Sequence, residues 1–184
     1  MRDHPAIGML EFTSIAAGIN AADIMVKTSE VRALFFRTIC PGKFLAAVSG
    51  DVAAVEASVR AGREASPETL ADWFVIPNIH GEVITALAGC VSLHEKGALG
   101  VIETFSAASA VLAADQAVKS ADVHLLEVRM ALGLGGKGYI LLTGDVAAVQ
   151  AAVNAGADQA RELGLLVGTT VLPRPDDALI AQLI

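Results

Sequence analysis

The sequence consists of two copies of one unit. Residues 6–37 match residues 98–129 with 13 of 32 positions identical, and residues 43–62 match residues 137–156 with 11 of 20 positions identical. A repeat of this length is typical of a structural unit that is used twice. Any fold predicted for the first half of the chain must therefore also suit the second half.

The repeat predicts two compact domains, residues 1–90 and 97–184, joined by a linker in the segment Gly89–Gly97. A chain of 184 residues that is 54% hydrophobic is long enough to bury two small cores. Its mean hydropathy of +0.57 is high, but charged or polar residues interrupt every long apolar stretch, so we predict no membrane-spanning helix. The apolar excess favours coverage of some surface by neighbouring subunits.

Each copy begins with a strand, residues 6–12 in the first, and Thr13 or Ser14 is placed to cap the helix that follows. Asp51 and Asp145 mark the start of a second helix in each copy. Apolar residues at helical spacing predict the buried face of the first helix in both copies: Ile15, Ile19, Ala22 and Val26, with the counterparts Ala107, Val111, Ala114 and Val118.

The remaining elements complete the same order twice. Further strands are predicted at residues 31–39, 44–49, 73–77, 123–131, 139–143 and 165–173, and short helical tails at residues 82–88 and 177–183. The resulting order, β-α-β-β-α-β, indicates an α+β fold that resembles a ferredoxin-like arrangement in duplicate.

Composition and motif spacing exclude several classes of function. A net charge of −7 and a pI near 5.0, with no basic stripe, argue against a nucleic-acid partner. The N-terminal residues fit neither a secretion signal nor a transit peptide, so we expect a cytoplasmic location. No catalytic triad, nucleophile elbow or pair of carboxylates stands out, so we expect no enzymatic activity. The histidines show no metal-ligand spacing: His4, His80, His94 and His124.

The two copies differ most in the loop between the second and third strands. The second copy has the glycine-rich segment Gly133–Gly138, which lacks the spacing of a phosphate-binding loop and leads into a strand, so it predicts a tight turn. The first copy has Cys40 followed by Pro-Gly-Lys, which places the thiol at a loop tip, although a lone cysteine is usually a small buried side chain. One thiol cannot hold an iron–sulfur cluster, which takes four protein ligands, whereas three chains around a threefold axis would supply three. Cys90 has no counterpart, and we expect a structural or incidental thiol there.

The motifs shared by both copies resemble the bacterial microcompartment shell domain. They are Ala-(Ile/Leu)-Gly-(Met/Val)-(Leu/Ile)-Glu, Ala-Ala-Asp followed by Val-Lys, Gly-Asp-Val-Ala-Ala-Val, and Ala-Gly. Two copies in one chain are similar to a tandem-domain shell protein. The segment Thr38–Phe44 and the unpermuted strand order resemble the type found in the propanediol-utilisation compartment, over about residues 5–180.

The resemblance implies a homotrimer that mimics a hexameric tile, with six shell domains around a central axis and edges that join other shell proteins in a cytoplasmic microcompartment. It implies tile-edge roles for Lys27, Lys119 and Arg174. The two kinds of edge differ, because the first copy has Pro77–His80 where the second has Pro173–Pro175. The implied pore residues are Pro41, Gly42, Lys43, Leu132, Gly133, Leu134, Gly135 and Gly136.

The resemblance also implies that Cys40 from three chains binds one [4Fe–4S] cluster at the pore, for electron transfer across the shell or for cluster loading and exchange. Encapsulated redox enzymes would then be partners. Lys43 lies close in sequence and would offset the thiolate charge, while Glu11 and Glu103 recur at one place in each copy and favour a structural or interface role. Two alternatives stay open: a cluster-free tile whose pore passes small polar metabolites, and a soluble ferredoxin-like ligand-binding protein.

Overall fold

The computed structural model describes residues 6–89, 97–130, 133 and 135–183. The chain forms two compact units. Unit 1 contains the described residues up to Ile79 and those among 130–136, and unit 2 contains the described residues from His80 to Arg129 and from Lys137 onward. Most of the predicted linker, including Cys90, lies outside the described residues.

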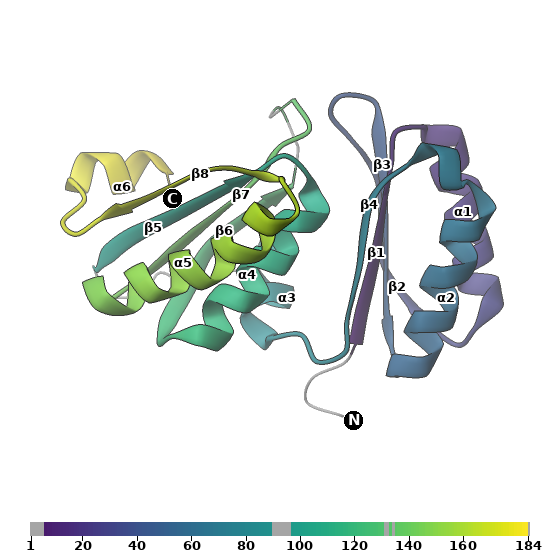
Figure 1. The fold of residues 1–184 in the computed structure, drawn as a ribbon, viewed down its shortest axis with the longest axis horizontal. Helices are drawn as coiled ribbons and strands as arrows, with labels where there is room; N and C mark the ends of the chain where they lie inside the picture. Colours follow the sequence, from purple (N-terminus) through teal and green to yellow (C-terminus); the bar gives the residue numbers. More distant parts are fainter. Residues whose placement is uncertain (1–5, 90–96, 131–132, 134, 184) are drawn as a thin grey trace. The chain divides into compact units, whose positions relative to one another are not determined.

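Unit 1 is a four-stranded antiparallel sheet with two helices side by side on one face (Figure 1). The strand order is β2-β3-β1-β4, and every residue of β1 is buried. The elements are β1 (Ala6–Phe12), α1 (Ile15–Thr28), β2 (Arg32–Ile39), β3 (Lys43–Gly50), α2 (Val52–Ala65), a 3₁₀ turn (Pro67–Thr69) and β4 (Leu70–Ile76).

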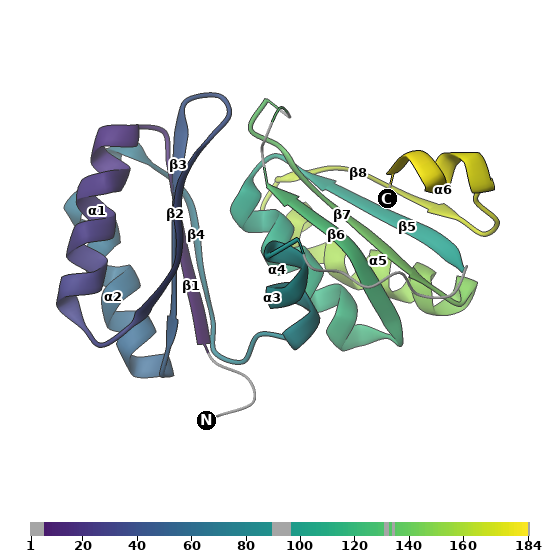
Figure 2. The same cartoon turned by 180° about the vertical axis from the view of Figure 1, so that it is seen from behind.

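Unit 2 repeats this architecture with the strand order β6-β7-β5-β8, and the two views in Figures 1 and 2 show α4 and α5 on one face of the sheet. The elements are α3 (Gly81–Leu87), β5 (Ala98–Thr104), α4 (Ala107–Ser120), β6 (Val123–Met130), β7 (Gly138–Gly144), α5 (Val146–Glu162), β8 (Leu166–Leu172) and α6 (Asp177–Leu183). The predicted α+β fold, with β-α-β-β-α-β twice, is confirmed.

The first helix of each unit differs in its buried face. The predicted stripe is right for α4, in which Ala107, Val111, Ala114 and Val118 are buried. It is wrong for α1, in which Ile15, Ile19 and Val26 are exposed and only Ala22 of the four is buried. The buried side of α1 is instead made of small residues and one methionine, because these allow the helix to approach β3 closely: Gly18, Ala21, Ala22 and Met25.

Helix capping follows the sequence only in part. Ser14 caps α1 by accepting the N–H of Ala17 at 3.3 Å, and its counterpart Ser106 caps α4 by accepting the N–H of Ser109 at 3.0 Å. Asp51 and Asp145 stand at the N-caps of α2 and α5, but neither side chain accepts a capping hydrogen bond. Their carboxylates still favour the helices through the positive end of the helix dipole.

Across the described residues, no helix combines the length and apolar character needed to cross a membrane.

Candidate metal-binding loop and edge residues

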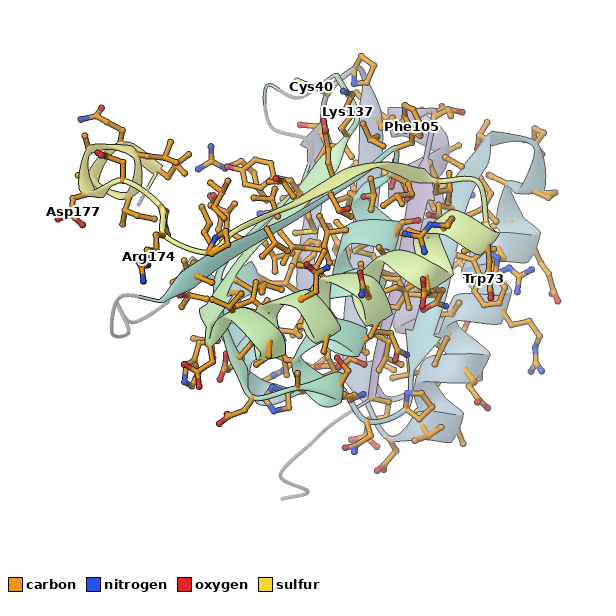
Figure 3. The ribbon with its side chains drawn as sticks, turned by 60° about the vertical axis from the view of Figure 1, so that its left-hand side comes forward. Cys40, Trp73, Phe105, Lys137, Arg174 and Asp177 are labelled. Atoms are coloured by element: carbon orange, nitrogen blue, oxygen red, sulfur yellow. The ribbon has the colours of Figure 1, made fainter. Side chains whose placement is uncertain are left out.

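The loop between β2 and β3 carries Cys40 at its tip. Cys40, Pro41 and Gly42 form a turn and are all exposed, and the Cys40–Pro41 peptide bond is cis. Gly42 has φ +74°, a left-handed conformation that glycine adopts without a Cβ clash. Figure 3 shows Cys40 at the end of this hairpin, where the thiol is free and accessible. The placement at a loop tip thus agrees with the sequence prediction.

A buried ion pair anchors the base of the loop. Lys43 Nζ donates to Glu11 Oε1 at 2.7 Å, and the Glu11 side chain is fully buried on the central strand β1. The same pair recurs in unit 2, where Lys137 Nζ lies 3.0 Å from Glu103 Oε1. The recurring glutamates therefore each hold the first residue after a loop, and their role is structural. The pairing could have been inferred from the sequence, because the glutamate and the lysine both recur at equivalent positions of the two copies.

This pair also bears on the charge of the loop. The ammonium of Lys43 is held by a buried carboxylate, and the Lys43 side chain is only 19% exposed. Its positive charge is therefore balanced by Glu11 before any thiolate is added. The hypothesis that Lys43 offsets thiolate charge consequently gains no support from the loop geometry.

The thiol of Cys40 is the right kind of ligand for an iron–sulfur cluster, because such clusters bind to Cys thiolates. Among the described residues of one chain, no group of three or more His, Cys, Asp or Glu side chains is placed to hold a metal ion. The described part of a single chain thus supplies an accessible thiol but no complete site. The residues fit a cluster only if several chains contribute.

The equivalent loop of the second copy has a different character. Gly133, Gly135 and Gly136 all have positive φ, which matches the predicted tight turn. This loop carries no thiol in its sequence. Leu132 and Leu134 lie outside the described residues.

The predicted edge lysines are both paired with an aspartate one helical turn earlier. Lys27 Nζ lies 2.5 Å from Asp23, and Lys119 Nζ lies 2.5 Å from Asp115. The side chain of Lys27 is 71% exposed, whereas that of Lys119 is 36% exposed because its partner Asp115 is almost completely buried. The shared motif Ala-Ala-Asp followed by Val-Lys contains both aspartates, but the sequence alone gave them no role, although the Asp-x-x-x-Lys spacing indicates an ion pair within a helix. The third edge residue, Arg174, is exposed between β8 and α6 (Figure 3).

The fold and the loops together define the class of protein. It is a duplicated α+β protein with an accessible thiol on one inter-strand loop and exposed cations at equivalent helix ends. The BMC domain family matches residues 6–79 and 98–175. The chain therefore belongs to this family and carries two of its domains in tandem. The predicted family and the predicted location in a bacterial microcompartment shell are confirmed.

Relatives cover nearly the whole chain. The bacterial microcompartment shell protein PduT of Citrobacter freundii is 45% identical over 179 residues, which are 97% of this chain and 97% of the relative. A solved microcompartment protein of Desulfitobacterium hafniense is 46% identical, with a TM-score of 0.87 over 97% of this chain and 99% of its own. The fused permuted hexameric shell protein MSM0275 is 23% identical with a TM-score of 0.66, over 86% of this chain and 82% of its own, a likeness that concerns the fold alone.

Proposed function

We propose that three copies of this chain form a pseudohexameric tile of a microcompartment shell, with a [4Fe–4S] cluster at the centre. Support for the tile comes from family membership over both domains and from the similarity to PduT across the full length. Relatives that are named as shell proteins also support a structural role without enzymatic activity.

The observation that carries the cluster proposal is the position of Cys40. The thiol is free, exposed and at the tip of a loop whose base is fixed by the Glu11–Lys43 pair. A threefold axis at this loop would bring three such thiols together. Because the second copy's loop has no thiol, a trimer would present three cysteine ligands and not six.

Three thiolates leave one iron of a four-iron cluster without a cysteine ligand from these loops. When bound, the cluster supplies one-electron redox chemistry. The chain's own contribution is to hold each thiol at the pore and to keep the loop base rigid through a buried ion pair. Such a centre would transfer electrons across the shell to or from encapsulated redox enzymes.

The test is purification without oxygen, followed by iron and sulfide assays and electron paramagnetic resonance. We expect about four irons per three chains. Cys40→Ser should lose the cluster while the oligomer stays intact, and Cys90→Ser is the matched control that should retain it. A Cys40→Ser protein with full iron and sulfide would contradict the proposal.

A cluster-free tile is the second candidate, favoured by the glycine-rich loop of the second copy, in which Gly133 and Gly135 have no heavy atom within 4 Å of a built Cβ. Such a loop offers backbone groups along a path for small polar metabolites. Absence of iron after anaerobic reconstitution, with reactive Cys40 thiols, would favour this candidate. A soluble ligand-binding protein differs from both in assembly: electron microscopy should reveal hexagonal discs for a tile and dispersed single chains for a soluble binder.

A further inference from the structure

The loop between β6 and β7, although it comes from the second copy, belongs to unit 1. Its described residues group with the first copy, which carries Cys40 on the equivalent loop. Met130 and Gly136, at the two ends of the loop, are both buried, whereas Gly133 and Gly135 are exposed. The ends of the glycine-rich loop are therefore part of the surroundings of the first copy.

Gly136 lies against the turn that carries Cys40. A Cβ built at Gly136 would be 3.1 Å from Pro41 Cδ, 3.6 Å from the carbonyl oxygen of Cys40 and 3.6 Å from Lys43 Nζ. These three atoms belong to the beginning, the middle and the end of the turn. Glycine allows such a close approach of two backbone segments, because any side chain would enter space that the turn already occupies.

The equivalent glycine of the first copy makes no such contact. Gly42 corresponds to Gly136, and both residues have a positive φ, +74° and +91°. A Cβ built at Gly42 meets nothing within 4 Å, and Gly42 is exposed while Gly136 is buried. Backbone conformation thus favours glycine in both loops, but packing requires it only at Gly136. The support runs in one direction, from the second copy's loop to the first copy's turn.

The two lysine–glutamate pairs differ in exposure in the same direction. The side chains of Lys43 and Glu11 are 19% and 0% exposed. Those of Lys137 and Glu103 are 41% and 40% exposed. Gly136 lies beside Lys43 Nζ and contributes to the exclusion of water from the first pair. The base of the thiol-bearing turn is therefore held by Glu11 on one side and covered by Gly136 on another.

We propose that Gly136 is a positioning residue for the Cys40 thiol. The glycine-rich loop packs against residues 40–43 of its own chain and fixes the direction in which the thiol points. The two loops are complementary, because one carries the thiol and the other lacks the side chain that would displace it. The inference rests on the proposed function for what the thiol binds, a cluster shared by three chains.

A shared cluster makes this support necessary. Each sulfur has to reach its iron from a loop tip, and loop tips are the most mobile parts of a fold unless other residues pack against them. Residues that surround a metal ligand orient it, and their loss commonly weakens metal binding by about 10–100-fold. Gly136 fills this role without touching the metal itself.

The test compares full-length variants that carry the same side chain at a positive φ. Gly136→Asn places the side chain against the turn. Gly164→Asn is the matched control, because Gly164 is exposed, has φ +69° and has nothing within 4 Å of a built Cβ. Asparagine tolerates positive φ better than most residues, so the backbone strain is similar in both variants. Gly136→Ala is the milder variant, for use if Gly136→Asn does not fold.

The first measurement is cluster retention after anaerobic purification. The rate at which a chelator removes iron should rise at least about tenfold in Gly136→Asn, as expected when a metal ligand loses its support. It should rise less in Gly136→Ala and stay at the parent rate in Gly164→Asn. The electron paramagnetic resonance line shape of the reduced cluster should change in Gly136→Ala and not in Gly164→Asn.

The second measurement needs no cluster. In a Cys90→Ser background Cys40 is the sole cysteine, and a short bifunctional maleimide joins two chains only where their Cys40 thiols lie close together. Chains of this background should cross-link in pairs. Adding Gly136→Asn should slow the cross-linking, whereas adding Gly164→Asn should leave its rate unchanged.

The outcomes separate the positioning role from the cluster. Gly136 variants that retain iron and cross-link at the parent rate would overturn the positioning role and leave the cluster in place, and so would equal losses in the Gly136 and Gly164 variants. A parent protein without iron, in which Gly136→Asn still slows cross-linking, would retain the positioning role and overturn the cluster. A parent protein that neither binds iron nor cross-links would overturn both.

Discussion

Gly18 lies directly against the ring of Phe44, because a Cβ built at Gly18 would be 2.6 Å from Phe44 Cδ1. In unit 2 the sizes are exchanged: Ala110 stands at the place of Gly18, and Gly138 stands at the place of Phe44. A Cβ built at Gly138 would be 2.7 Å from the Cβ of Ala110. Each unit thus has a glycine at the contact between helix and sheet. In unit 1 it is Gly18 on the helix, and in unit 2 it is Gly138 on the strand.

Gly18→Ala should destabilise unit 1, since the added methyl group overlaps a buried ring and α1 must move away from β3. We expect a loss of about 1–3 kcal/mol in the free energy of unfolding, measured by denaturant titration. Gly81→Ala is the matched helix control, because a Cβ there meets nothing within 4 Å. Equal stability of the two variants would contradict the close contact.

The two lysine–glutamate pairs should differ in their contribution to stability. Lys43→Met removes the ammonium from a fully buried carboxylate, which should cost about 3 kcal/mol of unfolding free energy. Lys137→Met disturbs a pair whose side chains are 41% and 40% exposed, and should cost less than ~1 kcal/mol. Denaturant unfolding of both variants checks the order, and a larger loss for Lys137→Met would refute it.

Much of the fold was predictable because the repeat fixes two equivalent sets of elements, and strand and helix patterns agree between the copies. The buried face of α1 was not predictable from apolar spacing. In α4 the predicted stripe is buried, but in α1 the residues Ile15 and Ile19 are exposed while Gly18 packs inward. Which face of α1 is buried depends on Phe44, which lies on strand β3. The spacing of apolar residues within one helix carries no information about a side chain on that strand.

The candidate site was predictable only where a chemical signal lies in one short segment. Pro41 and Gly42 placed Cys40 at a loop tip, and the structure agrees. The pairing of Lys43 with Glu11 joins residues 32 positions apart, so the lysine was assigned to the thiolate beside it in sequence instead. Sheet register determines such partners, and it brings β1 and β3 together only in the folded chain.

Tyr139 is the sole tyrosine of the sequence, so its titration can be followed directly. Burial, together with the hydrogen bond that Tyr139 donates to Glu127 at 2.7 Å, raises its pKa to about 12. We expect the phenolate absorbance to appear near that pH, and Glu127→Gln to lower the midpoint. Because the folded pKa is the higher one, the stabilisation is complete below the unfolded value near 10 and is lost as the pH rises through about 12. A midpoint near 10 in the folded parent would contradict this environment.

The docking of α3 should weaken in acid. Burial raises the pKa of Glu82, but the N–H of Leu125, the bond to His124 and the charges of His124 and His80 outweigh it, so the net pKa is lowered from 4.5. A carboxylate whose pKa is lowered by folding stabilises the folded state at pH values above its unfolded pKa. This stabilisation is lost as the pH falls through the pKa of the folded state. We expect amide exchange of α3 to accelerate below pH 4.5, relative to Glu82→Gln, in which this pH dependence is absent. Since Glu82 is partly exposed, the effect should be at most ~1 kcal/mol.

The two lysines that are predicted to lie at tile edges, Lys27 and Lys119, should respond differently to removal. Lys27 is mostly exposed and its partner Asp23 is exposed too, so Lys27→Ala should weaken sheet formation by tiles without lowering the stability of unit 1 by more than about 0.5 kcal/mol. Lys119 pairs with the buried Asp115, which also holds the N–H of His80. Lys119→Ala should therefore weaken sheets and also destabilise the docking of α3, by about 1–3 kcal/mol.

Electron microscopy of sheets and denaturant unfolding of dilute protein separate these two effects. An edge role alone predicts equal loss of sheets and no difference in stability between the variants. The burial of Asp115 predicts that only Lys119→Ala unfolds earlier, because the carboxylate left behind is buried in α4 while that of Asp23 stays in contact with water. Sheets that persist in the Lys27→Ala, Lys119→Ala double variant would remove the edge assignment, whatever the stabilities.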